Sequence, residues 1–361
     1  MNRFVFLFLL GVIACLSPGT AVSAERPRWD TRVFASVGSP GFPAYVYKHP
    51  NGRVYAGTYT NLTGDSLRSR VFEWTAGGTL LRSWTVPGQD LTADRGVQVA
   101  TSDARGRLVL LEKSTSSVLT LNVATGRFKR QATLPDLPLC SSGARPCSPN
   151  LFDSPAIPNY ATWGPGGALF VSDYGQAVIW RIPAGGGTPR VWFRSPALDG
   201  TEFGTTGLVY QPGRHAMLIG QQSTADPLSV PVAGKLYRLS VRDDGRPGLL
   251  STLWRSGPGD MPDGFGVARS GRVYVACLGT NQLVVLSATG AELTRFPSVP
   301  LVGSNGSPVP FDGPSNATFL GTRVLVANQA PFGDRSHQVI LDVEVGEPGA
   351  TPYLPARSRL S

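Results

Sequence analysis

Six segments of the sequence share one pattern, in which a short apolar stretch leads to a glycine-containing turn and then to an alternating apolar strand. The segments open at Ala44, Gln98, Asn159, Thr206, Asp263 and Ser315. Successive openings lie 54, 61, 47, 57 and 52 residues apart, and a period of about 50 residues is typical of a blade of four short strands. The sequence therefore predicts an all-β fold, a six-bladed β-propeller.

The two ends of the repeat indicate how the ring closes. Blade six has little sequence left after its third strand, at residues 337–343, whereas residues 31–36 have the character of an outer strand without a blade. Pairing that N-terminal strand with blade six would remove the open edges of the sheets. We expect the propeller to occupy residues 25–348, with a C-terminal tail at 349–361. We also expect a monomer, because a closed ring needs no partner to cover its edges.

The N-terminus is typical of an export signal. Arg3 precedes an apolar run at residues 4–14, which is shorter than the about 20 residues that a membrane span needs. Small residues at 21–24 predict a signal peptide at 1–24, cleaved before Glu25, while Cys15 offers an alternative site for a lipid anchor. We predict a secreted or periplasmic protein without a transmembrane segment, and favour the released form over the anchored one.

Composition excludes some classes of protein. With 41% hydrophobic residues the chain has enough apolar surface for a core, despite its 43 Gly and 31 Pro. The formal net charge is +9, but the Lys and Arg residues are scattered singly. That pattern favours a solvated basic surface over a nucleic-acid site, so we expect no nucleic-acid partner.

Cys140 and Cys147 flank a short polar loop. In an oxidising compartment this spacing predicts a local disulfide. The alternative, a metal clip, lacks a nearby His or further Cys. Cys277 lies inside an apolar strand and is interpreted as a buried thiol.

The blade openings also resemble a known family. Residues 157–161 with 170–173, 261–267 and 313–319 are similar to the blade openings of the senescence marker protein, gluconolactonase and luciferin-regenerating enzyme family. That family belongs to a wider group of six-bladed propellers that includes the strictosidine synthases. The resemblance covers about residues 30–345 and implies the propeller fold. It carries less weight for the reaction, because propellers host many chemistries.

The resemblance further implies a divalent cation, Ca²⁺ by preference, held at the axis by a first-blade Glu and by Asn and Asp openings of later blades. Asn159 and Asp263 match that motif, whereas Ala44 occupies the place of the Glu. One carboxylate is thus missing, and fewer charged ligands mean weaker Ca²⁺ binding. The alternative, that Asn159 and Asp263 only cap strand entries, stays open.

With a metal bound, the cation would polarise a carbonyl group and Asp263 would be the catalytic base. Glu112 and Asp173 follow second strands and are interpreted as loop hydrogen-bonders. We expect the polar openings and the neighbouring aromatic residues to bind the substrate near the mouth of the channel. These residues are Gln98, Thr206, Ser315, Tyr160, Phe265 and Phe311. We also expect some of the aromatic residues near the channel to pack between blades instead.

The sequence therefore predicts an exported propeller enzyme, a metal-assisted hydrolase of lactone or ester bonds in a small molecule. Two alternatives remain. The first is a metal-independent propeller enzyme of the isomerase or cyclase type, and the second is a non-catalytic propeller that binds a ligand or protein. No histidine opens a blade and no Gly-x-Ser-x-Gly motif occurs, so a histidine base or a Ser-His-Asp triad is not expected.

Overall fold

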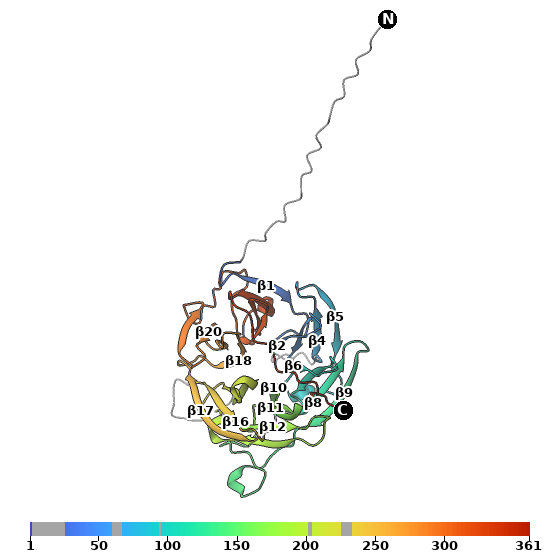
Figure 1. Cartoon of the computed structure of the whole chain (residues 1–361), viewed down its shortest axis with the longest axis vertical. Coiled ribbons are helices and arrows are strands. Elements are labelled where there is room, and N and C mark those ends of the chain that lie inside the picture. The colour runs from blue at the N-terminus through green and yellow to red at the C-terminus, as the bar shows by residue number, and fades with distance from the viewer. Residues whose placement is uncertain (2–25, 60–66, 94, 201–203, 225–232) are drawn as a thin grey trace.

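The computed structural model describes residue 1 and residues 26–59, 67–93, 95–200, 204–224 and 233–361. The predicted signal peptide, apart from Met1, and Cys15 lie outside the described residues. Six four-stranded antiparallel sheets surround a common axis, with β2, β6, β10 and β18 nearest the centre of the ring and β1, β5 and β17 at its periphery (Figure 1). The predicted six-bladed propeller is confirmed.

The first five blades each use four consecutive strands, from the axis outward. Blade one contains β2 (Pro43–Lys48), β3 (Val54–Thr58), β4 (Arg70–Trp74) and β5 (Leu80–Thr85). Blade two contains β6 (Val97–Ser102), β7 (Leu108–Glu112), β8 (Ser117–Asn122) and β9 (Arg127–Thr133). Blade three contains β10 (Pro158–Trp163), β11 (Leu169–Asp173), β12 (Val178–Ile182) and β13 (Arg190–Arg194).

Blade four contains β14 (Thr205–Gln211), β15 (Ala216–Gln221), β16 (Lys235–Val241) and β17 (Pro247–Arg255). Blade five contains β18 (Pro262–Val267), β19 (Val273–Cys277), β20 (Gln282–Leu286) and β21 (Glu292–Phe296). Blade six contains β22 (Pro314–Leu320), β23 (Arg323–Asn328), β24 (Val339–Glu344) and, outermost, β1 (Thr31–Ser36). The helices of the described ranges are short 3₁₀ turns: η1 (Leu91–Ala93), η2 (Cys140–Ser142), η3 (Pro165–Gly167), η4 (Pro196–Leu198), η5 (Pro212–Arg214) and η6 (Arg335–His337).

The ring closes through the first and last strands, as predicted. β1 pairs antiparallel with β24, with Thr31 opposite Val343 and Ser36 opposite Val339. Ion pairs hold the entry to β1 in place: Arg26 contacts Asp30 at 2.6 Å and Asp342 of β24 at 2.8 Å. The pairing supplies the fourth strand that blade six lacks and covers the free edge of β24.

Burial follows the position of a strand within its blade. All five residues of β3, β7 and β11 are buried, because these strands have neighbouring blades on both faces. Outermost strands such as β5 and β9 are mostly exposed or half-buried. The hydrophobic core is accordingly divided into six clusters, each of which lies between two adjacent blades.

The segment predicted as a tail packs against the propeller. It begins next to blade five, where Ala268 forms a bridge with Gly349, and passes the turns that join the two inner strands of blades four, three and two. Tyr353 stacks edge-on against Tyr210, with 5.1 Å between ring centroids. Leu360 is fully buried in the cluster between blades two and three. The C-terminal segment thus covers the end of the propeller that lies opposite the six blade openings.

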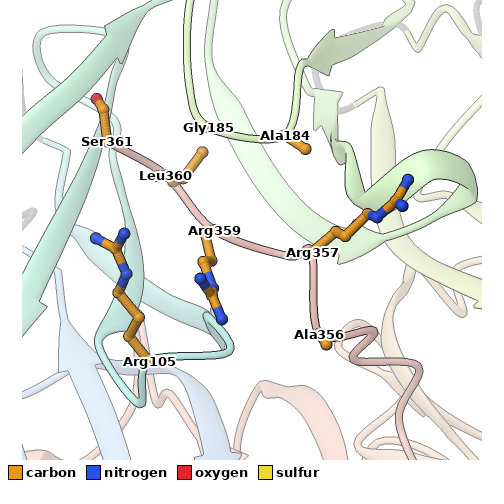
Figure 2. Close-up of a pocket in the computed structure, with 8 residues that line it drawn as sticks. All are labelled: Arg105, Ala184, Gly185, Ala356, Arg357, Arg359, Leu360 and Ser361. Carbon is orange, nitrogen blue, oxygen red and sulfur yellow. The ribbon is translucent and has the colours of Figure 1, made fainter.

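A hollow of about 560 Å³ borders the C-terminal segment on that same face (Figure 2). Three arginines line it, Arg105, Arg357 and Arg359, and all three are exposed. None of the six blade openings borders this hollow. It is therefore separate from the predicted site.

Two further predictions concern the cysteines and membrane association. Cys140 and Cys147 form the predicted disulfide, in the connection between β9 and β10. Cys277 is a buried free thiol. In the ranges that the structure describes, no helix has the length and apolarity to cross a membrane.

The buried position of Leu360 predicts that the C-terminal segment contributes to stability. We expect Leu360→Ala to lower the free energy of unfolding by about 2–3 kcal/mol, because it removes a fully buried side chain and leaves a cavity. Urea denaturation measures the difference. Leu249→Ala is the matched control, since Leu249 is 75% exposed on β17. Equal stability of the two variants would show that the segment is not part of the core.

Candidate functional site

The six predicted openings occupy equivalent positions in the structure. Each is the second residue of the innermost strand of its blade, so all six lie at the same end of the axis. Five of the six are buried, and Asp263 is partly exposed. The predicted convergence of the openings at one end of the axis is therefore present.

The side chain of Lys113 contacts residues of several blades at this end of the axis. It directly follows β7, and its backbone N–H donates to Gly96 O at 3.1 Å, which ties it to the entry of β6. The ammonium donates to Asn159 Oδ1 at 2.5 Å and to the hydroxyl of Tyr59. It also lies 4.9 Å from the ring centroid of Tyr59, within the range of a cation–π contact.

Gln98 completes the surroundings of this ammonium. The hydrogen-bond network sets the orientation of its amide: the oxygen accepts from Lys113 Nζ at 3.3 Å, and the nitrogen donates to Asn159 Oδ1 at 3.2 Å. The oxygen of Asn159 therefore accepts hydrogen bonds from two side chains of blade two. Gln98 and Asn159 lie together as predicted, but around a lysine.

Asp263 lies in the blade opposite that of Lys113, since blades two and five face each other across a six-membered ring. Tyr160 lies beside it, with its hydroxyl 3.3 Å from Asp263 Oδ1. The same hydroxyl donates to Ser315 O at 2.8 Å, so the Tyr160 ring reaches from blade three to blade six across the axis. Gly264 permits this approach, because a Cβ there would come within 2.2 Å of the Tyr160 hydroxyl.

Burial and mutual charge determine the ionisation of the site. Burial lowers the pKa of Lys113, the carboxylate of Asp263 opposes that shift, and Arg95 adds to it. Burial raises the pKa of Asp263, while the charge of Lys113 and the hydroxyl of Tyr160 lower it. Each group thus favours the charged form of the other. Burial also raises the pKa of Tyr59 and Tyr160, so both phenols stay protonated at neutral pH.

The other polar openings bond to the backbone of neighbouring blades. Thr206 Oγ1 donates to Pro262 O at 3.4 Å, and Ser315 Oγ donates to Ala44 O at 2.7 Å. These hydroxyls join adjacent inner strands. Their predicted role in substrate binding would require them to exchange those bonds for contacts with a ligand.

The predicted aromatic residues divide between the axis and the core. Tyr160 lies at the axis, whereas Phe265 is buried among residues of blades four and five and Phe311 among those of blades five and six. Phe311 is 1% exposed and packs edge-on against Phe296. We expected both phenylalanines near the mouth of the channel, but the apolar surfaces between blades cover them.

Two acidic side chains near the site are structural. Glu112 accepts hydrogen bonds from the backbone N–H groups of Ser114 and Thr115. Asp173 accepts them from backbone N–H groups at 157 and 175 and from the indole of Trp180, at 2.7–3.0 Å. Both are loop hydrogen-bonders, as predicted.

Sequence reasoning missed Lys113 and Tyr59. Lys113 follows a wholly apolar strand and one acid, at the position where the chain returns to the mouth of the channel. That position could have predicted its role, because a lysine just past the end of the second strand of a blade lies near the axis. Tyr59 occupies the equivalent place after β3, one residue past the strand end.

Known structures share this architecture, although no protein family model and no curated protein sequence matches the chain. A gluconolactonase from Xanthomonas campestris has a TM-score of 0.57 and 17% identity, covering 87% of this chain and 88% of that one. A calcium-binding protein, regucalcin, from Agrobacterium tumefaciens has a TM-score of 0.57 and 15% identity, covering 90% and 98%. A luciferin-regenerating enzyme has a TM-score of 0.56 and 12% identity, covering 88% and 97%.

The chain has the fold of these six-bladed propellers. The predicted resemblance to the senescence marker protein, gluconolactonase and luciferin-regenerating enzyme family is thereby confirmed at the level of the fold. Identities of 12–17% carry the argument no further than architecture.

One structural neighbour is a calcium-binding protein, but the polar groups at the axis of this chain do not fit a divalent metal. Ca²⁺ takes six to eight oxygen ligands, with carboxylates among them. Here Asp263 is the one carboxylate among the six openings, and Asn159 Oδ1 already contacts the ammonium of Lys113. A divalent cation at that oxygen would be repelled by the lysine. Within the described ranges, no three His, Cys, Asp or Glu side chains gather to hold a metal.

The opposed charges of Lys113 and Asp263 predict energetic coupling. We expect Lys113→Met to destabilise the fold by about 1–3 kcal/mol, because it leaves the buried oxygen of Asn159 without a hydrogen-bond donor and removes the positive charge opposite Asp263. Lys113→Met combined with Asp263→Asn should cost less than the two single changes added together. Denaturant unfolding of the four proteins at neutral pH measures the coupling. Additive effects would show that the two groups do not interact.

Proposed function

We propose that this protein is a small-molecule hydrolase that opens lactone or ester bonds at the axial site, with Asp263 as its general base. The observation that carries the proposal is a partly exposed carboxylate, Asp263, set opposite a buried ammonium at the end of the axis where the blades open. The gluconolactonase among the structural neighbours supports this choice of substrate class. The predicted substrate-binding residues Gln98, Thr206 and Ser315 open their blades at the same end of the axis, and they keep that role in the proposal.

The environment of Asp263 suits a general base. Burial raises its pKa from the ordinary carboxyl range, which strengthens it as a proton acceptor, while the charge of Lys113 keeps the ionised form accessible. A base whose pKa lies closer to the working pH transfers protons more efficiently. Tyr160, 3.3 Å from Asp263 Oδ1, orients the carboxylate.

The reaction consumes one water molecule, and Asp263 carries one proton from that water to the leaving oxygen. Asp263 takes a proton from water as the water oxygen bonds to the carbonyl carbon, and the carbonyl electron pair moves to its oxygen. The tetrahedral intermediate then collapses, the bond to the ring or ester oxygen breaks, and Asp263 returns the proton to that leaving oxygen. The product is a hydroxy acid, or an acid and an alcohol, and Asp263 ends as a carboxylate.

We also propose that the protein acts outside the cytoplasm and as a monomer. The apolar run at residues 4–14 and the disulfide between Cys140 and Cys147 support export. The closed ring of blades supports a monomer, because no sheet edge of blade six is left open at β24.

A panel of lactones and esters tests the proposed reaction. We expect turnover of at least one, and we expect Asp263→Asn to lower kcat by about 100-fold or more, because general-base catalysis contributes that much. Asp243→Asn is the matched control, since the Asp243 side chain is fully exposed. Binding of the substrate by Asp263→Asn, measured calorimetrically, would separate catalysis from a purely binding role. Unchanged turnover in Asp263→Asn would remove Asp263 from the mechanism.

The pH profile follows from the same group. Activity should rise with pH as Asp263 loses its proton, and the rise should lie above the ordinary carboxyl range because burial raises this pKa. Lys113→Met should move the rise to higher pH, since the positive charge that lowers the pKa is gone. Profiles of kcat/KM against pH for the wild type, Lys113→Met and the exposed-site control Lys129→Met would show this. A profile that Lys113→Met leaves in place contradicts the assignment.

A further inference from the structure

The protein supplies a hydrogen-bond acceptor for each N–H donor of the Lys113 ammonium. An ammonium has three N–H donors, and three acceptors surround this one: Asn159 Oδ1 at 2.5 Å, the hydroxyl of Tyr59, and the amide oxygen of Gln98 at 3.3 Å. These acceptors come from blades one, two and three. The rings of Tyr59 and Tyr174 add cation–π contacts at 4.9 and 5.8 Å. Lys113 itself is 3% exposed, so solvent does not compete for these positions.

Charge balance points the same way. Asp263 supplies a single negative charge among the six openings, and Lys113 supplies a single positive charge in the opposite blade. Arg95 adds further positive potential near Lys113. A divalent cation placed between Asn159 and Asp263 would leave an excess of positive charge in a buried region, which is unfavourable.

We propose that the ammonium of Lys113 is the built-in cation of the axial site, taking the place of a divalent metal. Asn159 and Asp263, which the sequence nominated as metal ligands, serve this ammonium instead, Asn159 by direct contact and Asp263 by charge. The site then provides positive potential for the oxygen of a carbonyl substrate without binding a metal. The role of the ammonium toward a carbonyl substrate rests on the proposed function, whereas the claim that the site binds no metal does not.

Metal titration without substrate tests the claim that the axial site binds no divalent metal. Full-length protein treated with EDTA is titrated calorimetrically with CaCl₂, MgCl₂ or MnCl₂, and its thermal unfolding is followed with and without each salt. We expect no saturable binding and no shift in Tm for the wild type. Saturable binding of one equivalent of any of these metals, abolished in Asp263→Asn, would overturn the proposal.

Variants sharpen the test. Lys113→Ala combined with Ala44→Glu removes the ammonium and adds a carboxylate at the first-blade opening, so this variant should gain Ca²⁺ binding and a Ca²⁺-dependent rise in Tm. Lys113→Arg keeps the charge and should bind no Ca²⁺, as should the exposed-site control Lys129→Ala. Ca²⁺ binding by Lys113→Arg equal to that of the double variant would show that the charge at 113 does not exclude the metal. If the double variant does not fold, the wild-type titration alone decides.

Turnover separates this inference from the proposed function. If a lactone or ester is hydrolysed, EDTA should leave kcat/KM unchanged within about twofold. Loss of activity in EDTA that Ca²⁺ restores would overturn the built-in cation while leaving the hydrolase intact. If no lactone or ester is hydrolysed, the proposed function fails, and the metal titration still decides whether Lys113 stands in place of a metal.

Discussion

The antiparallel pairing of β1 with β24 is the contact on which the other features of the propeller depend. It joins the N-terminal strand to the last blade, and ion pairs from Arg26 to Asp30 and Asp342 reinforce it. With the ring closed, each of the six hydrophobic clusters is enclosed by two blades, including the cluster that joins blade six to blade one. Opening the ring would expose that cluster and a sheet edge together.

Closure also determines the geometry of the axis. In a ring of six, blades two and five face each other, which sets Lys113 opposite Asp263. Blades three and six also face each other, which allows the hydroxyl of Tyr160 to reach Ser315 O at 2.8 Å. The inner strands contribute small or polar openings, and the larger side chains of the site come from the positions beside them. A ring with another number of blades would not bring these pairs together.

The site has an unusual balance of charges for a buried region. A lysine with all its donors satisfied is matched to one carboxylate, and two phenols held in their neutral form surround the pair. Taking charges out of water is unfavourable, and opposite charges and hydrogen bonds such as these offset part of that cost.

Local patterns in the sequence determined much of this protein. The alternation of apolar residues and the glycine turns repeat every 47–61 residues. Because side chains alternate between the two faces of a strand, each strand could be recognised from its own residues. The blade count, the six openings and the closing strand could therefore be predicted. The disulfide between Cys140 and Cys147 was predictable because both partners lie in one short loop. The tertiary structure alone decided which of the predicted side chains contact one another at the axis and which further side chains join them. Lys113 and Tyr59 reach the axis from positions just past strand ends, and Phe265 and Phe311 pack into the surfaces between blades. Leu360 packs into a cluster whose other members lie 178 to 260 residues before it in the chain. These outcomes depend on contacts between distant segments, which no local period encodes.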